Sequence, residues 1–266
     1  MNKNLSARRA LACGSAVLAC AAWTASASAA SITWDLRNND GCGAAGEPAC
    51  SSNYGNTRQY TQGGVKMTGS AYADTDSNYA NEDQRRIETA HLGHYSGNGL
   101  GVTNRDNDSG SPNHATDNDS RFDAIRLEFD TAVRLTDLFF GWADGDSDFT
   151  VLFYTGSGST GLTGERYNTL SPEWGVLGHY DSYDDGWKTL SNTNVFSRYW
   201  LVLAYNNVFT GTTRNLDGGQ TSLDERDDYF KIGKVTVETP TQVPEPGSLA
   251  LLGLGLIGLA RARRTG

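Results

Sequence analysis

Basic residues are scarce in this sequence, and the shortage limits the partners that the protein can bind. The 266 residues include 22 lysines and arginines against 31 aspartates and glutamates. The imbalance lies between residues 31 and 242, which contain 16 basic and 30 acidic side chains. A surface with this excess of negative charge repels nucleic acids and anionic lipid head groups. We therefore expect no nucleic-acid partner.

The sequence also lacks the common signatures of enzymes. It contains no Gly-x-Ser-x-Gly, no His-Glu-x-x-His, no P-loop and no dinucleotide-binding motif. A glycoside hydrolase needs a pair of carboxyl groups, and no spacing brings two of the glutamates together. The candidates for such a pair are Glu88, Glu128, Glu165 and Glu173. The sequence favours a protein that is not an enzyme.

No sustained helical periodicity occurs between residues 31 and 242. Short segments with alternating apolar residues are found instead, separated by turn residues every 8 to 15 positions. The clearest are 125–130, 149–154, 174–180 and 199–205. This pattern predicts an all-β fold, a single domain over residues 31–242 with a β-sandwich or jelly-roll architecture.

Cysteine is rare, with four residues in the whole chain, and two of them fall in the N-terminal segment. The other two, Cys42 and Cys50, lie between residues 31 and 242, inside a loop of glycine, alanine and proline. An even number of cysteines in an oxidising compartment favours a disulfide that closes a small loop.

Residues 1–30 have the organisation of a secretory signal peptide. Lys3, Arg8 and Arg9 form a positive region, residues 10–23 are apolar, and Ala27-Ser28-Ala29 provides small residues for cleavage. The sequence therefore predicts export of the chain from residue 30 or 31 onward.

The last 24 residues, 243–266, combine three features. Pro244, Glu245 and Pro246 form an extended motif without helical hydrogen bonds. A run of 14 residues from Gly247 to Ala260 is apolar apart from Ser248, which is shorter than the roughly 20 residues of a stable membrane span. The basic end consists of Arg261, Arg263 and Arg264 and holds the terminus in the cytoplasm.

This tail resembles the PEP-CTERM sorting signal of Gram-negative bacteria. The resemblance implies a short transmembrane helix that anchors the chain transiently in the inner membrane. It further implies processing near the motif by a membrane-embedded exosortase and transfer to the cell surface or the extracellular polymer. Several blocks of the exported part, such as Glu88 to Gly97 and Gly99 to Asp106, also resemble exosortase-dependent surface proteins.

Three aspartates at alternate positions suggest a calcium site. Asp144, Asp146 and Asp148 lie in the turn between two expected strands, where their carboxylates can converge on one ion. The pattern is not an EF-hand, because Phe149 and Thr155 stand where that motif has Gly and Glu. A solvated acidic turn is the alternative.

Aromatic residues suggest a sugar-binding surface. Tyr180, Tyr183 and Trp187 lie in a polar stretch and form the set expected to be exposed, although aromatic residues on strands more often fill the core. The sequence as a whole predicts an exported, non-catalytic protein of the cell surface or extracellular matrix, associated with exopolysaccharide or another surface glycan. A lectin-like carbohydrate-binding module, with or without calcium, is the first alternative, and a secreted glycoside hydrolase is the second.

Overall fold

The computed structural model describes residues 29–38, 57–76, 85–106, 110–158, 160–191, 194–216, 223–240 and residue 263. Residues 1–28 of the predicted signal peptide, the cysteines Cys42 and Cys50, and the apolar run of the tail lie outside these residues, and so do Pro244, Glu245, Pro246, Arg261 and Arg264. No helix within the described ranges has the length and apolarity needed to cross a membrane.

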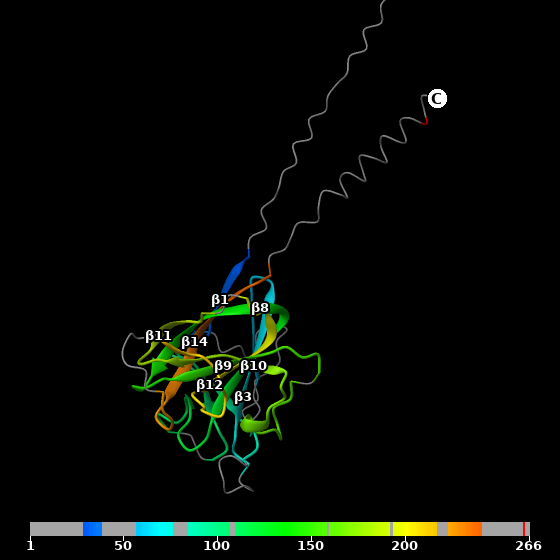
Figure 1. The fold of residues 1–266 in the computed structure, drawn as a ribbon. Helices are drawn as coiled ribbons and strands as arrows, with labels where there is room; N and C mark the ends of the chain where they lie inside the picture. The colour runs from blue at the N-terminus through cyan, green and yellow to red at the C-terminus, as the bar shows by residue number, and fades with distance from the viewer. Residues whose placement is uncertain are drawn as a thin grey trace, which may run out of the picture. The chain divides into compact units, whose positions relative to one another are not determined.

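The longest strand, β8 (Asp123–Ala143), connects the two sheets of the domain. Its 21 residues would extend for about 70 Å if the strand were straight, at about 3.3 Å per residue. Residues 123–133 of β8 pair with β3 (Val65–Ala73) and β12 (Ser197–Ala204), whereas residues 134–143 pair with β14 (Tyr229–Glu238) and β11 (Gly186–Thr189). β8 therefore begins in one sheet and ends in the other (Figure 1).

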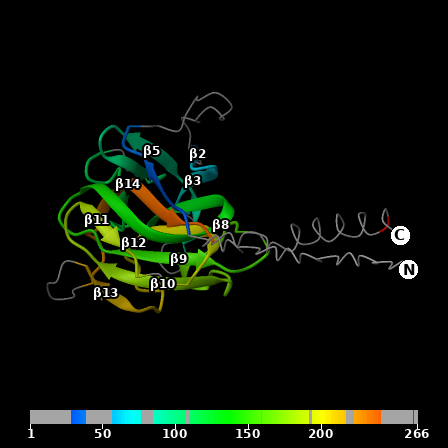
Figure 2. The same cartoon turned by 90° about the horizontal axis from the view of Figure 1, so that it is seen from above.

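We call the two layers sheet I and sheet II. Sheet II contains the first half of β8 and, in order beyond β12, the strands β9 (Phe149–Tyr154), β10 (Trp174–Asp181) and β13 (Thr213–Asn215). On the other side of β8 it continues through β3 to β2 (Thr57–Gln62) and β4 (Glu88–Thr89). Figure 2 shows β9, β10 and β13 side by side.

Sheet I is built around β14. One edge of β14 pairs with the second half of β8, and β11 follows on the far side of β8. The other edge pairs with β1 (Ser31–Asp35), β6 (Gly99–Thr103) and β7 (Thr116–Asp117), and β5 (His91–Tyr95) pairs with β6. Every ladder among the described strands is antiparallel except the one between β10 and β13.

Aromatic side chains from the two sheets meet in the main core. The ring of Trp34 in sheet I lies 5.5 Å from that of Phe129 in sheet II, and Phe140 in sheet I lies 5.0 Å from Phe149 in sheet II. All four residues are buried, because alternate side chains of each strand point to the interior. The contacts confirm the prediction of an all-β sandwich.

A second apolar layer covers the outer face of sheet II. Leu152 of β9 and Leu201 and Leu203 of β12 point away from the main core and are nonetheless buried. Leu162 and Tyr167, from the connection between β9 and β10, pack on them, and Tyr167 begins a single turn of 3-10 helix, η2 (Tyr167–Thr169). Both faces of β12 are therefore covered, which explains its nearly continuous apolar sequence.

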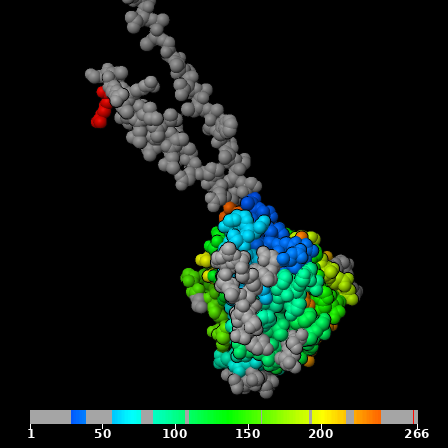
Figure 3. Space-filling view, turned by 180° about the vertical axis from the view of Figure 1, so that it is seen from behind, coloured from blue at the N-terminus to red at the C-terminus, as the bar shows by residue number. Residues whose placement is uncertain are grey.

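The first and last strands of the domain lie next to each other. β1 pairs with the end of β14, with Ser31 opposite Glu238, and the amide of Thr239 donates to the carbonyl of Ala30 over 3.0 Å. On the face shown in Figure 3, blue and cyan N-terminal segments share the surface with green segments from the middle of the chain. The sandwich is thus closed by contacts between distant parts of the sequence.

The approach of β6 to β14 generates a prediction about two glycines with positive φ. A Cβ at Gly99 (φ +106°) would lie 2.1 Å from the carbonyl oxygen of Ile232, whereas a Cβ at Gly97 (φ +82°) meets nothing within 4 Å. We expect Gly97→Ala to cost about 1–2 kcal/mol through backbone strain alone. Gly99→Ala is expected to cost about 4 kcal/mol or more, because the backbone of β6 or β14 must move to separate the new Cβ from the carbonyl oxygen of Ile232. Urea denaturation of both variants measures the difference, and equal costs would contradict the described packing of β6.

Candidate functional site

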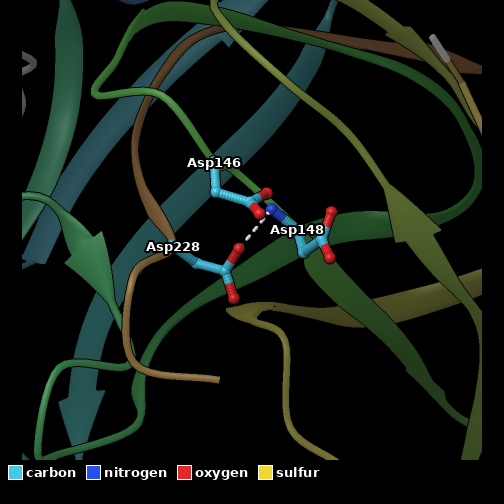
Figure 4. A group of neighbouring side chains, drawn as sticks. All are labelled: Asp146, Asp148 and Asp228. Atoms are coloured by element: carbon cyan, nitrogen blue, oxygen red, sulfur yellow. Dashed lines mark hydrogen bonds between the residues drawn. The ribbon is translucent and has the colours of Figure 1, made fainter. Parts of the chain in front are cut away.

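Three buried or half-buried aspartates form a cluster at the ends of strands. Asp146 lies in the turn after β8, Asp148 directly precedes β9, and Asp228 directly precedes β14. One carboxylate oxygen from each of the three lies within 4.8 Å of the others. Figure 4 shows Asp146 and Asp148 on one loop and Asp228 on a segment far away in the sequence, with the Asp228 carboxylate bonded to the backbone nitrogen of Asp148.

Hydrogen bonds to the two buried carboxylates fix the loops that carry them. The backbone N–H of Asp148 donates to Asp228 Oδ1 over 2.5 Å, and the N–H of Ser182 donates to Asp148 Oδ1 over 2.7 Å. Asn118 Nδ2 donates to Asp228 Oδ2 over 2.5 Å. Segments that contain residues 118, 148, 182 and 228 therefore meet at the cluster.

Burial acts against the ionised form of all three carboxyl groups. Burial, together with the neighbouring charges of Asp146 and Asp181, raises the pKa of Asp148 to about 8. Burial also raises the pKa of Asp228 well above its usual range and raises the pKa of Asp146. The site thus favours any species that brings positive charge to these oxygens, either protons or a cation.

The cluster differs in one member from the set that the sequence suggested. Asp146 and Asp148 are brought together, but Asp144 is exposed and belongs to neither carboxylate group found among the described residues. Asp228, 80 residues further along the chain than Asp148, takes the third place. A second group joins Asp146 to the more exposed pair Asp224 and Asp227.

The three aromatic residues predicted to be exposed divide into two kinds. Tyr183 and Trp187 are exposed, at 57% and 53% of their surface. Tyr180 has no exposed surface, so the prediction that it belongs to an exposed set is wrong. Its position on β10 turns it inward, where its ring stacks on Phe149 with the centroids 4.7 Å apart.

Trp187 lies on the outer face of sheet I beside other rings and charges. Its ring is 5.2 Å from that of Phe139, in an edge-on arrangement. Lys234 Nζ lies 5.7 Å from the centroids of both rings, and the guanidinium of Arg37 lies 5.3 Å from that of Phe139. An exposed indole beside hydrogen-bonding groups is the kind of surface on which a sugar ring can stack.

A polar pocket lies at a different place, against the second apolar layer. Its volume is about 150 Å³, and its lining includes Asp74, Arg85, Arg166, Asn206 and Glu225. The side chain of Asp74 is buried, and its Oδ1 accepts the backbone N–H of Phe122 over 2.7 Å. Burial nevertheless raises the pKa of Asp74 to about 7.

The fold and the tail together define a class of protein, an all-β cargo domain with a terminal sorting signal. Residues 242–264 match the family described as the PEP-CTERM protein-sorting motif. The chain therefore carries a PEP-CTERM sorting motif at its C-terminus, and this motif indicates a surface protein targeted by an exosortase. No curated protein and no solved structure matches the chain.

The raised pKa of Asp74 predicts a pH dependence of stability. The unfolded chain loses this proton near the ordinary value of 3.8, whereas the folded domain keeps it until about pH 7. The contribution of Asp74 to stability therefore falls as pH rises from about 4 to about 7.

In melting curves across this range, Asp74→Asn should gain stability relative to the native chain as the pH increases. Asp130→Asn, which changes an exposed carboxylate, is the control and should run parallel to the native chain. If the curve of Asp74→Asn also ran parallel to that of the native chain, the raised pKa of Asp74 in the folded domain would be contradicted.

Proposed function

We propose that this protein is a non-catalytic component of the cell surface or extracellular matrix, delivered there by an exosortase. The PEP-CTERM match at residues 242–264 is the observation that carries the proposal. The all-β domain supports it, because a sandwich held together by buried aromatic contacts is a suitable structural unit for an exposed layer.

The properties of the tail support a transient anchor. The apolar run of 14 residues is short for a permanent span, which takes roughly 20. Four glycines within it, at positions 247, 253, 255 and 258, weaken an ordinary helix by about 1 kcal/mol each. We infer that the chain is held in the inner membrane during processing and then released to its final location.

The carboxylates of the domain support a role without catalysis. Asp148 and Asp228 accept backbone N–H bonds inside the protein. The pocket is lined by Asp74 and Glu225, and Asp74 is also bonded to backbone. Glycoside hydrolysis requires two carboxyl groups on opposite sides of a bound sugar. The buried hydrogen bonds of these groups fit a structural role better.

The sorting proposal predicts that the motif, and not proline content in general, determines delivery. A chain with Pro244→Ala and Pro246→Ala should accumulate unprocessed in the membrane fraction, because the extended segment read by the exosortase is lost. Pro240→Ala, just outside the motif, is the matched control and should be delivered normally.

Mass spectrometry of the surface-released native protein should give a C-terminus near the motif, upstream of Gly266. Unchanged delivery of a chain that lacks residues 243–266 would end the proposal.

The surface around Trp187 favours a second candidate function, binding of an exopolysaccharide or another surface glycan. The exposed indole, the neighbouring Phe139 and the charged groups of Lys234 and Arg37 provide both a stacking surface and hydrogen-bond donors. Tyr183, also exposed, adds a second ring in the segment just before β11.

Glycan binding is tested by removing one ring at a time. Trp187→Ala should lower affinity for neutral polysaccharide by about tenfold or more, as loss of a central aromatic contact does at binding surfaces. Phe196→Ala removes another exposed ring, on a different segment, and should leave binding unchanged. Affinity electrophoresis in gels that contain the polysaccharide measures both. Equal mobility of Trp187→Ala and the native chain would exclude the surface around Trp187 as the glycan-binding site.

A further inference from the structure

The carboxylate cluster has the dimensions of a calcium site. Oxygens bound to one Ca²⁺ lie about 2.4 Å from the ion, so any two of them are at most about 4.8 Å apart. The ligand atoms of Asp146, Asp148 and Asp228 satisfy this limit, since they lie within 4.8 Å of one another. Asp224 and Asp227 form a further group with Asp146 and add negative charge beside the cluster.

A second observation, independent of the spacing, points to a missing positive charge. Asp148 is 1% exposed, and its Oδ2 has no hydrogen-bond partner. The carboxyl groups of Asp146 and Asp148 also contact each other. Two ionised carboxylates only accept hydrogen bonds, so the pair is satisfied only by a shared proton or by a cation. A buried acceptor without a donor is costly, and a cation between the two groups removes that cost.

We propose that Asp146, Asp148 and Asp228 bind a calcium ion that ties the loop between β8 and β9 to the segment before β14. Their three carboxylates supply the protein ligands, and water completes the six to eight oxygens that the ion prefers. The proposal does not rest on the sorting function or on glycan binding.

The chemistry of the donors selects calcium over other common ions. All of the donors are carboxylate oxygens, which suit hard cations, whereas zinc and copper sites use histidine and cysteine. Magnesium requires near-octahedral geometry and retains most of its water, so it is rarely held by an all-protein carboxylate cage. Extracellular calcium modules bind with dissociation constants of about 0.1–1 mM, which fits a protein that functions outside the cell.

The ion would also fix the surface that carries the exposed aromatic residues. Asp148 Oδ1 accepts the N–H of Ser182, and residue 146 forms a backbone bridge with Tyr183. The loop that leads to Trp187 is therefore attached directly to two of the proposed ligands. Loss of the ion should loosen this loop as well as the start of β14.

Calcium dependence is tested first on the full native chain, purified in mild detergent and freed of metal with a chelator. Adding about 5 mM calcium should raise its melting temperature by about 2–9 °C, as expected for a dissociation constant of about 0.1–1 mM and a domain of this size. The same concentration of magnesium should give less than half of this shift. Isothermal titration with calcium chloride should show one site with a submillimolar dissociation constant.

Aspartate-to-asparagine variants distinguish a metal site from a purely structural network. Asp148→Asn keeps an oxygen for the backbone N–H of Ser182 but removes charge, whereas Asp228→Asn also loses the oxygen that accepts from Asn118. Without calcium, Asp148→Asn should therefore melt at or above the native temperature and Asp228→Asn below it, and neither variant should respond to calcium. Asp144→Asn and Asp130→Asn should keep the full calcium shift, because both residues lie outside the cluster.

Identical melting temperatures of the native chain in calcium and in chelator would overturn the proposal. So would a full calcium shift in Asp148→Asn. Should a variant fail to fold, the titration of the native chain still decides, because the absence of binding heat and of a melting shift excludes the site.

Discussion

The register of β8 is the constraint on which both sheets depend. Within its second half, a bulge against β14 places Asp137 opposite Thr236 and Leu135 opposite Val237, which leaves one extra residue on β8. The extra residue shifts the alternation, so that Leu135 and Leu138 are both buried. Without it, the end of β8 would turn its apolar side chains outward, and sheet I would lose its half of the core.

The carboxylate cluster lies directly beside packed aromatic rings of this core. Phe149 follows Asp148 directly, and Phe230 is two residues after Asp228. The rings of Phe140 and Phe230 stack at 4.2 Å, and Phe149 contacts both of them. Packing of these rings holds the starts of β9 and β14 in place, so the carboxylates that precede them cannot move apart to relieve their repulsion. Apolar burial thus maintains an arrangement that electrostatics alone would not form.

The parts of the structure that the sequence predicted are those with local signals. Alternating side chains predicted β9, β10, β12 and the first part of β8, and the tail is recognisable because its motif, apolar run and arginines are contiguous. Contacts between distant segments gave no such signal. Asp228 was missed as the partner of Asp148 because 80 residues separate them.

Two further differences between the predicted and the observed structure also arise from contacts between distant segments. The glycine-rich segment that forms β6 is not among the strands predicted from the sequence, yet Gly99 is required where this segment approaches the backbone of β14. Tyr180 looks polar from its aspartate-rich neighbours, and only the position of Phe149 in the next strand shows that it is buried. In both cases the deciding neighbour is on another strand.

The pairing of β1 with β14 sets the order in which the domain can be completed. The ribosome makes β1 long before β14, because the contact between Thr33 and Thr236 spans 203 positions. Until the final strand has been made, the first has an unpaired edge and no route to the native topology. Assembly must therefore be late and governed by long-range pairing, which is slow. A chain that stays open until its end has emerged is also one that can pass through a narrow channel before it folds.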